Sequence, residues 1–293
     1  MHPRVSVIMP FVAEEGFLSE AIESVRNQEF GEWELLLVDD GAADVSRRIA
    51  ERFVAADPRR IRLLDPDSER RGAAAARNRA LAQARGEFLA FLDADDAFRP
   101  RKLAREVAAL DAHTEAAMLY ARTRWWYQGI RGHDWTERLG VAPDRLYAPP
   151  YLFTRILLEK KGDIPCTCGV LLRKGVVMDE GGFEERFALY EDQSLWAKLF
   201  LSHSVFVSNA CHALYRQHPG STSATAQSRG DYDNYGAHRA QDAFFRWLAA
   251  LVTERNAAPE VLQAVYQAKV KSRRVPGRMR RLLLRALRHA RAS

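Results

Sequence analysis

Three carboxylates stand together in residues 91–96, which read Phe-Leu-Asp-Ala-Asp-Asp. Asp is common in turns for backbone reasons alone, so a turn without chemistry is one interpretation. A cation site is the other, because clustered carboxylates repel one another unless a cation lies between them. Oxygen ligands with room for phosphate oxygens suit a hard divalent ion. The segment therefore also fits Mg²⁺ or Mn²⁺ bound to a diphosphate.

A second acidic pair, Asp39 and Asp40, precedes Gly41 at the end of another apolar run. The pair could form a turn or an N-cap for the next helix, although Asp44 could equally be that cap. A carboxylate at a sheet edge could instead accept a hydrogen bond from the N–H of a pyrimidine base. The residues alone leave both interpretations open.

Both acidic groups follow apolar runs in a stretch that alternates between strand and helix patterns. Strands are predicted at 5–10, 35–38, 61–64, 88–92 and 117–121, and helices at 17–27, 45–56, 73–84 and 100–110. Such alternation predicts right-handed βαβ crossovers and an α/β fold with a largely parallel sheet. Ligands of these sheets bind at the carboxyl ends of the strands, where the Asp residues lie.

The alternation fades after residue 122. The next stretch is rich in aromatic side chains, for which we favour packing in a strand or loop core over stacking on the face of a sugar: Trp125, Trp126, Tyr127 and Trp135. Further strands are predicted at 170–172 and 205–207, and helices at 191–201, at 235–254 and from Pro259 onward.

The composition is that of an ordinary folded protein. The 293 residues are 47% hydrophobic and 28% charged, which excludes collagen-like and mostly disordered chains. No run of about 18 apolar residues predicts a membrane-spanning helix, so we expect a soluble or peripheral protein. Cys166, Cys168 and Cys211 lack the spacing of a structural zinc site, which favours reduced thiols in the cytoplasm.

Several motifs in the first half occur in a definite order: Val5-Ser6-Val7-Ile8-Met9-Pro10, Trp33-Glu34-Leu35, Val38-Asp39-Asp40-Gly41, Ala76-Arg77-Asn78, Gly86-Glu87-Phe88 and Phe91-Leu92-Asp93-Ala94-Asp95-Asp96. A second block follows: Gly181-Gly182-Phe183, Tyr190-Glu191-Asp192 and Tyr215-Arg216-x-His218. This ordered set resembles the family 2 inverting glycosyltransferases, which have the GT-A fold. The resemblance covers roughly residues 4–224. It implies a GT-A domain over 1–230, with a nucleotide-sugar-binding half to about 122 and an acceptor half at 123–230, followed by C-terminal helices at 231–293.

The resemblance also implies roles for single residues. The nucleotide-sugar would contact Pro10, Phe11, Asp39, Asp40, Arg77, Asp93 and Ala94. Asp95 would bind the metal, with Asp93, Asp96 and His218 close to it, and Asp192 would be the general base supported by Glu191. Without the resemblance, Arg77 would be a solvent-facing helix residue, His218 a loop residue, and the Glu191–Asp192 pair a helix start favoured by the helix dipole.

One position departs from the family pattern. The family usually has an aromatic residue and an Asn after the first-strand proline, whereas this chain has Val12 and Ala13 there, preceded by Phe11. Stacking on a base is worth on the order of 1–3 kcal/mol, so the departure bears on donor affinity and base identity.

The excess of basic residues is confined to the C-terminus. Ten of the 44 Lys and Arg residues lie within residues 269–291, which contain no Asp or Glu, so the rest of the chain is slightly acidic. From Arg278 onward the pattern fits an amphipathic helix with an arginine-rich face, which predicts that 277–293 binds an anionic membrane surface. A helix packed on the body and a frayed end are the alternatives. We expect no nucleic-acid binding, because no stacking platform accompanies the basic residues.

The sequence thus predicts a metal-dependent inverting transferase that moves a sugar from a nucleoside-diphosphate-sugar, a UDP-sugar above all, to a hydroxyl of a glycan or lipid-linked acceptor. Bacterial cell-surface polysaccharide synthesis, on the cytoplasmic face of the inner membrane, is the expected setting. A sugar-phosphate nucleotidyltransferase is an alternative, although the chain lacks that class's glycine-rich phosphate loop near the first strand. A catalytically inactive, membrane-associated binding protein is the other.

Overall fold

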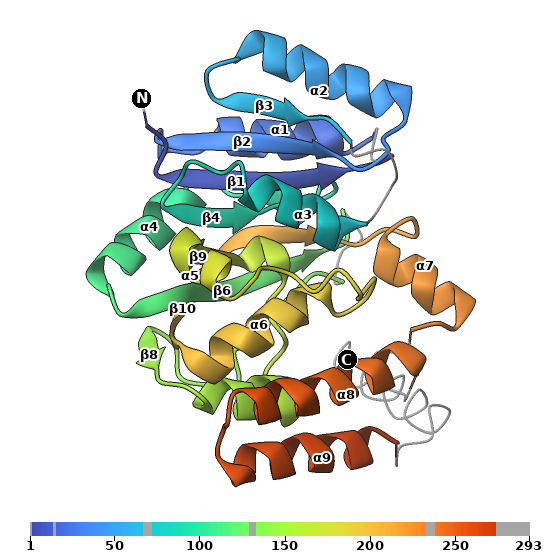
Figure 1. Cartoon of the computed structure of the whole chain (residues 1–293). Coiled ribbons are helices and arrows are strands. Elements are labelled where there is room, and N and C mark those ends of the chain that lie inside the picture. Colours follow the sequence, from blue (N-terminus) through green and yellow to red (C-terminus); the bar gives the residue numbers. More distant parts are fainter. Residues whose placement is uncertain (1, 14–15, 67–71, 129–132, 233–237, 274–293) are drawn as a thin grey trace.

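One mixed β-sheet organises the part of the chain that the computed structural model describes, namely residues 2–13, 16–66, 72–128, 133–232 and 238–273. The strand order is β3-β2-β1-β4-β9-β6-β10-β5, with β7 beside β6 and β8 beside β10. Helices cover the sheet on both faces (Figure 1). The α/β class predicted from the sequence is confirmed.

The described strands are β1 (Val5–Phe11), β2 (Trp33–Asp39), β3 (Ile61–Leu64), β4 (Phe88–Phe91), β5 (Ala97–Phe98), β6 (Ala116–Trp126), β7 (Trp135–Thr136), β8 (Arg145–Tyr147), β9 (Val170–Arg173) and β10 (Ser204–Arg216). The described helices are α1 (Leu18–Arg26), α2 (Asp44–Ala56), α3 (Ala73–Leu81), α4 (Lys102–Ala112), α5 (Lys174–Asp179), α6 (Glu191–Ser202), α7 (Thr222–Arg229), α8 (Arg239–Glu254) and α9 (Pro259–Arg273), with the short turns η1 (Phe153–Leu158) and η2 (Thr167–Gly169).

The first four strands of the sheet are parallel, as the alternating pattern predicts. β2 lies between β3 and β1, and β1 also pairs with β4. Every residue of β1 and β2 is buried, which is typical of central strands covered on both faces. Phe11 is level with Asp39 across the β1–β2 pair, so the carboxyl ends of these strands meet at one edge of the sheet.

The second half of the sheet is mixed. β9 runs antiparallel to both of its neighbours, β4 and β6, whereas β6 and β10 are parallel to each other. β6 and β10 are longer than the predicted runs 117–121 and 205–207. Their extensions carry half-buried polar residues such as Arg124 and Cys211, so the apolar pattern ends before the strands do.

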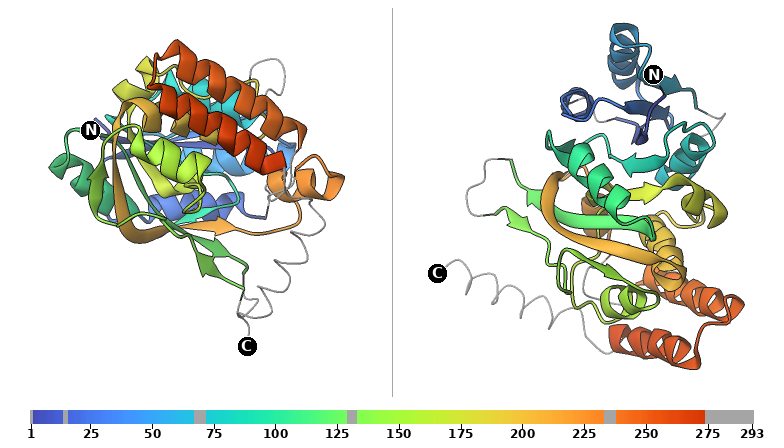
Figure 2. Two further views of the ribbon diagram at one scale, coloured as in Figure 1. Left: turned by 90° about the horizontal axis from the view of Figure 1, so that it is seen from below. Right: turned by 90° about the vertical axis from the view of Figure 1, so that its left-hand side faces the viewer.

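Two apolar layers form on either side of the sheet. Residues alternate between them along a strand: Val7 packs with the layer under α1 and α4, and Ile8 packs with the layer under α3, α6 and α8. α8 and α9 lie side by side beyond α6 (Figures 1 and 2). The site residues therefore sit on a rigid, two-sided core.

The aromatic residues at the end of β6 and in β7 lie mostly outside this core. Trp125, Trp126 and Tyr127 are half-buried, and Trp135 is 39% exposed. Trp135 stacks on Trp125 with ring centres 4.6 Å apart. Our core interpretation is therefore wrong for Trp135, because the two-residue strand β7 pairs with β6 at the margin of the sheet.

Three residues of the sequence motifs, Ser6, Glu34 and Gly86, take part in one buried polar network. The Ser6 hydroxyl donates to Glu34 Oε1 at 2.7 Å and accepts the backbone N–H of Gly86 at 2.8 Å. Glu34 also accepts the N–H of Arg85 at 2.6 Å. A Cβ on Gly86 would lie 2.5 Å from the backbone nitrogen of Ser6, so this close approach requires glycine.

The C-terminal predictions are tested only in part. The helices predicted at 235–254 and from Pro259 are confirmed as α8 and α9, the first from Arg239 onward. Within the described residues, none of the helices has the length and apolar character needed to span a bilayer. The predicted basic segment 277–293 lies outside the described residues.

Candidate active site

A buried arginine joins the two groups of acidic residues that the sequence singles out. Arg77 lies on α3, and its guanidinium is only 2% exposed. It donates to Asp93 Oδ1 at 2.5 Å and to Glu191 Oε1 at 3.1 Å. Asp93 follows β4 and Glu191 begins α6, so these two elements meet across one side chain. The solvent-facing interpretation of Arg77 is wrong, because its side chain is buried and both carboxylates bind it there.

Asp192 lies next to this bridge at the start of α6. Its Oδ1 accepts the backbone N–H of Gln193 at 2.6 Å. Burial raises the pKa of Asp192 to about 7, and the neighbouring negative charge of Glu191 acts in the same direction. Burial also raises the pKa of Glu191, against the opposing effect of Arg77. A carboxyl group with a pKa near neutrality can take up a proton at physiological pH.

Asp95 faces the end of β10. Its Oδ2 lies 2.8 Å from Nε2 of His218, two residues beyond the end of that strand. Burial raises the pKa of Asp95, and Asp93 adds to the effect while His218 opposes it. The Arg216 guanidinium donates to the backbone carbonyl of Asp95 at 2.5 Å and to Glu20 at 2.7 Å. Arg216 therefore connects the loop that carries Asp95 to α1.

Asp96 points into the interior, away from water. Its side chain is completely buried, and Oδ1 accepts the backbone N–H of Arg216 at 2.9 Å. Burial, together with the charges of Asp95 and Asp93, raises its pKa well above the ordinary value. Asp96 thus ties the acidic loop to β10, a supporting position behind Asp95.

The carboxylates at the end of β2 accept hydrogen bonds from nearby backbone groups. Asp39 accepts the N–H groups of Gly41 and Ala42 at 2.9 and 2.7 Å, and it pairs with Arg47 at 2.8 Å. Asp40 accepts the N–H of Gly72, just before α3, at 3.1 Å. The structure therefore supports the turn interpretation for Asp39, whereas Asp40 connects the end of β2 to the start of α3.

The remaining predicted donor residues are buried. Pro10 and Phe11 end β1, and the Phe11 ring is 1% exposed within the apolar layer beneath α1. Ala94 is 2% exposed between Asp93 and Asp95. Phe11 therefore has no free ring face for stacking on a base, and it does not replace the aromatic residue that the family usually places at Val12.

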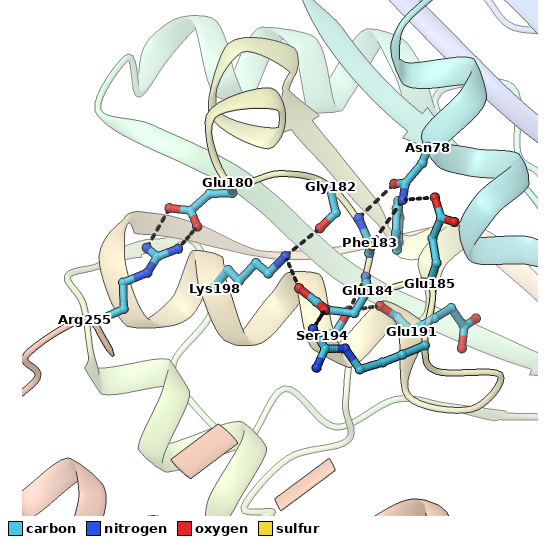
Figure 3. Close-up of polar contacts among 11 residues, drawn as sticks. Asn78, Glu180, Gly182, Phe183, Glu184, Glu185, Glu191, Ser194, Lys198 and Arg255 are labelled. Atoms are coloured by element: carbon cyan, nitrogen blue, oxygen red, sulfur yellow. Dashed lines mark hydrogen bonds and ion pairs between the residues drawn. The ribbon is translucent and has the colours of Figure 1, made fainter. Parts of the chain in front are cut away.

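The Gly-Gly-Phe motif of the second half binds directly to α3 (Figure 3). The Asn78 amide accepts the N–H of Phe183 and donates to its carbonyl, both at 2.9 Å. Gly182 has φ of +67°, and a Cβ there would lie 2.6 Å from Asn78 Oδ1. Lys198 of α6 donates to the Gly182 carbonyl at 3.1 Å, so this segment joins α3 to the helix that carries Asp192.

Sequence reasoning missed three contacts of the site. The Thr167 hydroxyl donates to Asp93 Oδ2 at 3.3 Å, Glu20 of α1 pairs with Arg216, and Arg79 donates to the carbonyl of Asp39 at 2.6 Å. Thr167 carries no sequence signal, because it stands between two cysteines. Arg79 directly follows the motif Ala76-Arg77-Asn78, and this adjacency is the signal that could have identified it.

A divalent cation fits the donor atoms of Asp95 and His218. Their Oδ2 and Nε2 atoms lie 2.8 Å apart, so both can face a single ion. Carboxylate oxygen is a ligand that Mg²⁺ and Mn²⁺ prefer, and imidazole is a common metal ligand. One or two protein ligands completed by substrate phosphates is the usual arrangement for Mg²⁺. The described residues contain no group of three or more His, Cys, Asp or Glu side chains placed to hold a metal ion.

Solved glycosyltransferase structures share this fold. S. aureus TarS in complex with UDP-GlcNAc superposes with a TM-score of 0.66 over 94% of this chain and 74% of that one, at 21% identity. The mannosyltransferase PcManGT from Pyrobaculum calidifontis, in complex with GDP-Man and Mn²⁺, gives 0.57 over 98% and 81%, at 18% identity. The site residues therefore sit on a glycosyltransferase fold of the GT-A type.

The sequence comparisons define the family. The model of Glycosyl transferase family 2 matches residues 6–179. The Escherichia coli glucosyltransferase WfgD, described as acting from UDP-Glc on α-D-GlcNAc-diphosphoundecaprenol, is 31% identical over 70% of this chain and 73% of its own length. The Bacillus subtilis putative glycosyltransferase EpsE is 40% identical over 38% of this chain, a match that spans 40% of EpsE. This chain belongs to glycosyl transferase family 2.

Proposed function

We propose that this protein is a metal-dependent inverting glycosyltransferase of cell-surface polysaccharide synthesis. It transfers a sugar from a nucleoside-diphosphate-sugar, with UDP as the nucleotide, to a hydroxyl group of a glycan or lipid-linked acceptor. The observation that carries the proposal is the Arg77 bridge between Asp93 and Glu191. This bridge supports the proposal because it joins the segment that carries Asp93 to the start of α6, where the proposed base lies, and direct displacement needs donor and base at one site.

Asp192 is the general base of the proposed reaction. Inversion needs a carboxylate that removes the proton of the attacking hydroxyl, on the side opposite the departing diphosphate. The raised pKa of about 7 makes Asp192 a stronger base than an ordinary Asp while leaving it substantially ionised at neutral pH. Glu191, held by Arg77, keeps the helix start in place, and its negative charge adds to the effect of burial on the pKa of Asp192.

The donor lies along the carboxyl ends of β1, β2 and β4. Asp40 reads the base, with Asp39 holding the turn beside it, and the backbone of Pro10, Phe11 and Ala94 lines the nucleotide. The Arg77 guanidinium, with Asp93, lies close to the diphosphate. UDP is favoured because UDP-GlcNAc occupies the TarS structure and UDP-Glc is named as the donor of WfgD.

Asp95 and His218 hold the divalent ion, Mn²⁺ or Mg²⁺, with Asp93 beside them and Asp96 in support. When bound, the ion neutralises the negative charge that develops on the departing diphosphate. The Mn²⁺ of the PcManGT complex supports a divalent ion here. The Arg216 guanidinium fixes the Asp95 backbone and therefore the orientation of this carboxylate.

A thermal-shift screen tests the donor and the ion together. UDP, GDP and their sugars are added with and without Mn²⁺, because ligands that bind only the folded state raise its melting temperature. We expect the largest rise with a UDP-sugar plus Mn²⁺, and a smaller rise when Asp95→Asn is tested. A product assay separates the alternatives: release of UDP indicates transfer, release of pyrophosphate indicates a nucleotidyltransferase, and no turnover with retained binding indicates an inactive binding protein.

The basic segment 277–293 belongs to the proposal as a membrane-surface element. Its arginines each add about 1 kcal/mol of attraction near an anionic surface, which would bring the enzyme to a lipid-linked acceptor on the cytoplasmic face of the inner membrane. Removal of 277–293 should abolish co-sedimentation with anionic liposomes and leave donor binding intact. Unchanged co-sedimentation would contradict this element alone.

A further inference from the structure

A pocket of about 560 Å³ opens beside β7 and η1 and has no part in the proposed transfer step. Three arginines from separate segments line it: Arg122 of β6, Arg138 after β7, and Arg155 of η1. Glu137, which is buried, and Tyr151, which is 49% exposed, also line the pocket. Three guanidinium groups around one opening favour an anionic occupant.

The arginines of this pocket have unused hydrogen-bonding capacity. Arg138 contacts Asp163 through Nε and Nη2 at 3.5 and 3.3 Å, and Arg155 pairs with Glu159 at 3.3 Å. Both arginines are partly exposed to water, where such pairs are weak. Among the described residues, Arg122 has no ion-pair partner, and the Nε–H groups of Arg122 and Arg155 are buried without an acceptor. Guanidinium forks match phosphate oxygens in geometry and charge, so a phosphoryl group in the pocket would suit the arginines that line it.

The rim of the pocket has the character of a sugar-binding surface. Tyr151 is 49% exposed, and its ring stacks on Tyr147 with centres 5.3 Å apart and planes 10° from parallel. This stacking holds the Tyr151 ring in one orientation and leaves part of it open. An aromatic side chain with an apolar face and a polar end suits the mixed surface of a sugar ring.

The pocket is close to the donor residues. Glu137 accepts a hydrogen bond from the Cys166 thiol at 2.9 Å, and the next residue, Thr167, donates to Asp93 Oδ2. Only residues 166–167 therefore separate the pocket wall from the carboxylate that Arg77 holds.

We propose that this pocket binds a phosphate or diphosphate group of the acceptor while the acceptor's hydroxyl lies at Asp192. This inference rests on the proposed function and specifies the substrate class: an acceptor that carries a phosphoryl group near the sugar to be extended. The phosphoryl group can belong to a lipid-linked diphosphate or to a soluble or polymeric sugar phosphate, since both present the same oxygens to the arginines.

Calorimetric titration with pyrophosphate, in EDTA, tests the inference on the full chain. The wild type should bind, and Arg122→Gln or Arg155→Gln should weaken binding about tenfold or more, because each removes a charged hydrogen-bond donor. The control is Arg145→Gln, an exposed arginine on β8 outside the pocket, which should change binding less than twofold. Asp95→Asn should also leave binding unchanged, because the donor site is not involved.

Absence of binding to the wild type, equal binding by Arg122→Gln, or loss of binding only in Asp95→Asn would each overturn the inference. UDP release by donor hydrolysis, measured in the same variants, tests the proposed function independently of the pocket. Arg122→Gln should release UDP at the wild-type rate even if the pocket does not bind pyrophosphate. A titration with geranyl diphosphate distinguishes a lipid-linked diphosphate from a soluble or polymeric sugar phosphate. Tighter binding than pyrophosphate supports a lipid-linked acceptor, and equal binding supports a soluble or polymeric phosphate.

Discussion

The two halves of the sheet position their functional residues in different ways. In the first half, Asp39 ends β2 and Asp93 follows β4 by two residues, so topology alone brings both to one edge. In the second half, Glu191 and Asp192 begin a helix, and His218 follows a thirteen-residue strand. The positions of these residues depend on side-chain contacts with the first half.

The difference indicates which parts of the site are most sensitive to mutation. The donor residues rest on fully buried parallel strands, whereas the base depends on Arg77 and on the contact between Asn78 and Phe183. Changes to those ties should therefore disturb the acceptor half while the parallel strands persist. Substitutions on either side of these ties, and the pH dependence of the rate, test this contrast.

Replacement of Asp192 should cause the largest loss. Asp192→Asn should lower turnover by about 10² to 10⁴, the usual contribution of general-base catalysis, with donor affinity retained. Stability at pH 8 should stay equal or rise, because the raised pKa means that the wild-type fold bears the cost of the ionised carboxylate above pH 7. Steady-state kinetics, donor titration and thermal unfolding measure the three quantities. A parallel fall in donor affinity and turnover would contradict the assignment of the base.

Removal of the Arg77 bridge should loosen the two halves from each other. Arg77→Met leaves Asp93 and Glu191 without their shared cation, which should lower the free energy of unfolding by about 3 kcal/mol. Urea unfolding measures this loss. Arg105→Met, at an exposed arginine on α4, is the matched control and should have little effect. Equal stability of the two variants would show that the bridge does not hold the site together.

Substitution of Gly182 tests the second tie to α3. Gly182→Ala should destabilise the fold by about 1–3 kcal/mol, because φ is +67° and the new Cβ would meet Asn78 Oδ1. Gly175→Ala on α5 is the control: a Cβ there meets nothing within 4 Å, so the change should be neutral or stabilising. Thermal unfolding of both variants measures the difference. A neutral Gly182→Ala would mean that the segment moves to accept the methyl group.

The pH dependence of the rate should report the raised pKa. Because Asp192 must be ionised to accept a proton, kcat/KM should fall about tenfold per pH unit below about pH 7, and it should level off above that value. An ordinary Asp would keep the rate constant down to about pH 4. In Asp192→Asn, kcat/KM should not show this fall below pH 7. A wild-type rate that is flat between pH 5 and 8 would exclude Asp192 as the titrating group.

Much of the first half could be predicted from the sequence because its signals are local. Apolar runs marked β1 to β4 to within about two residues, and their ends located Asp40 and Asp93. The strand β9 could also be predicted, at 170–172, but its antiparallel pairing and the extensions of β6 and β10 could not be, since they depend on pairing between distant segments. The same reason hid Thr167, whose contact with Asp93 spans 74 residues of sequence. The roles of the site residues remain predictions.

The helix α3 has a consequence for how this region can vary. Arg77, Asn78 and Arg79 are consecutive, and a helix turns about 100° per residue, so the three side chains leave it in three directions. Each holds a different segment: the acidic pair Asp93 and Glu191, the Gly-Gly-Phe motif, and the end of β2. Insertion or deletion of one residue within α3 would misdirect all three at once. Natural length variation should therefore fall outside this helix.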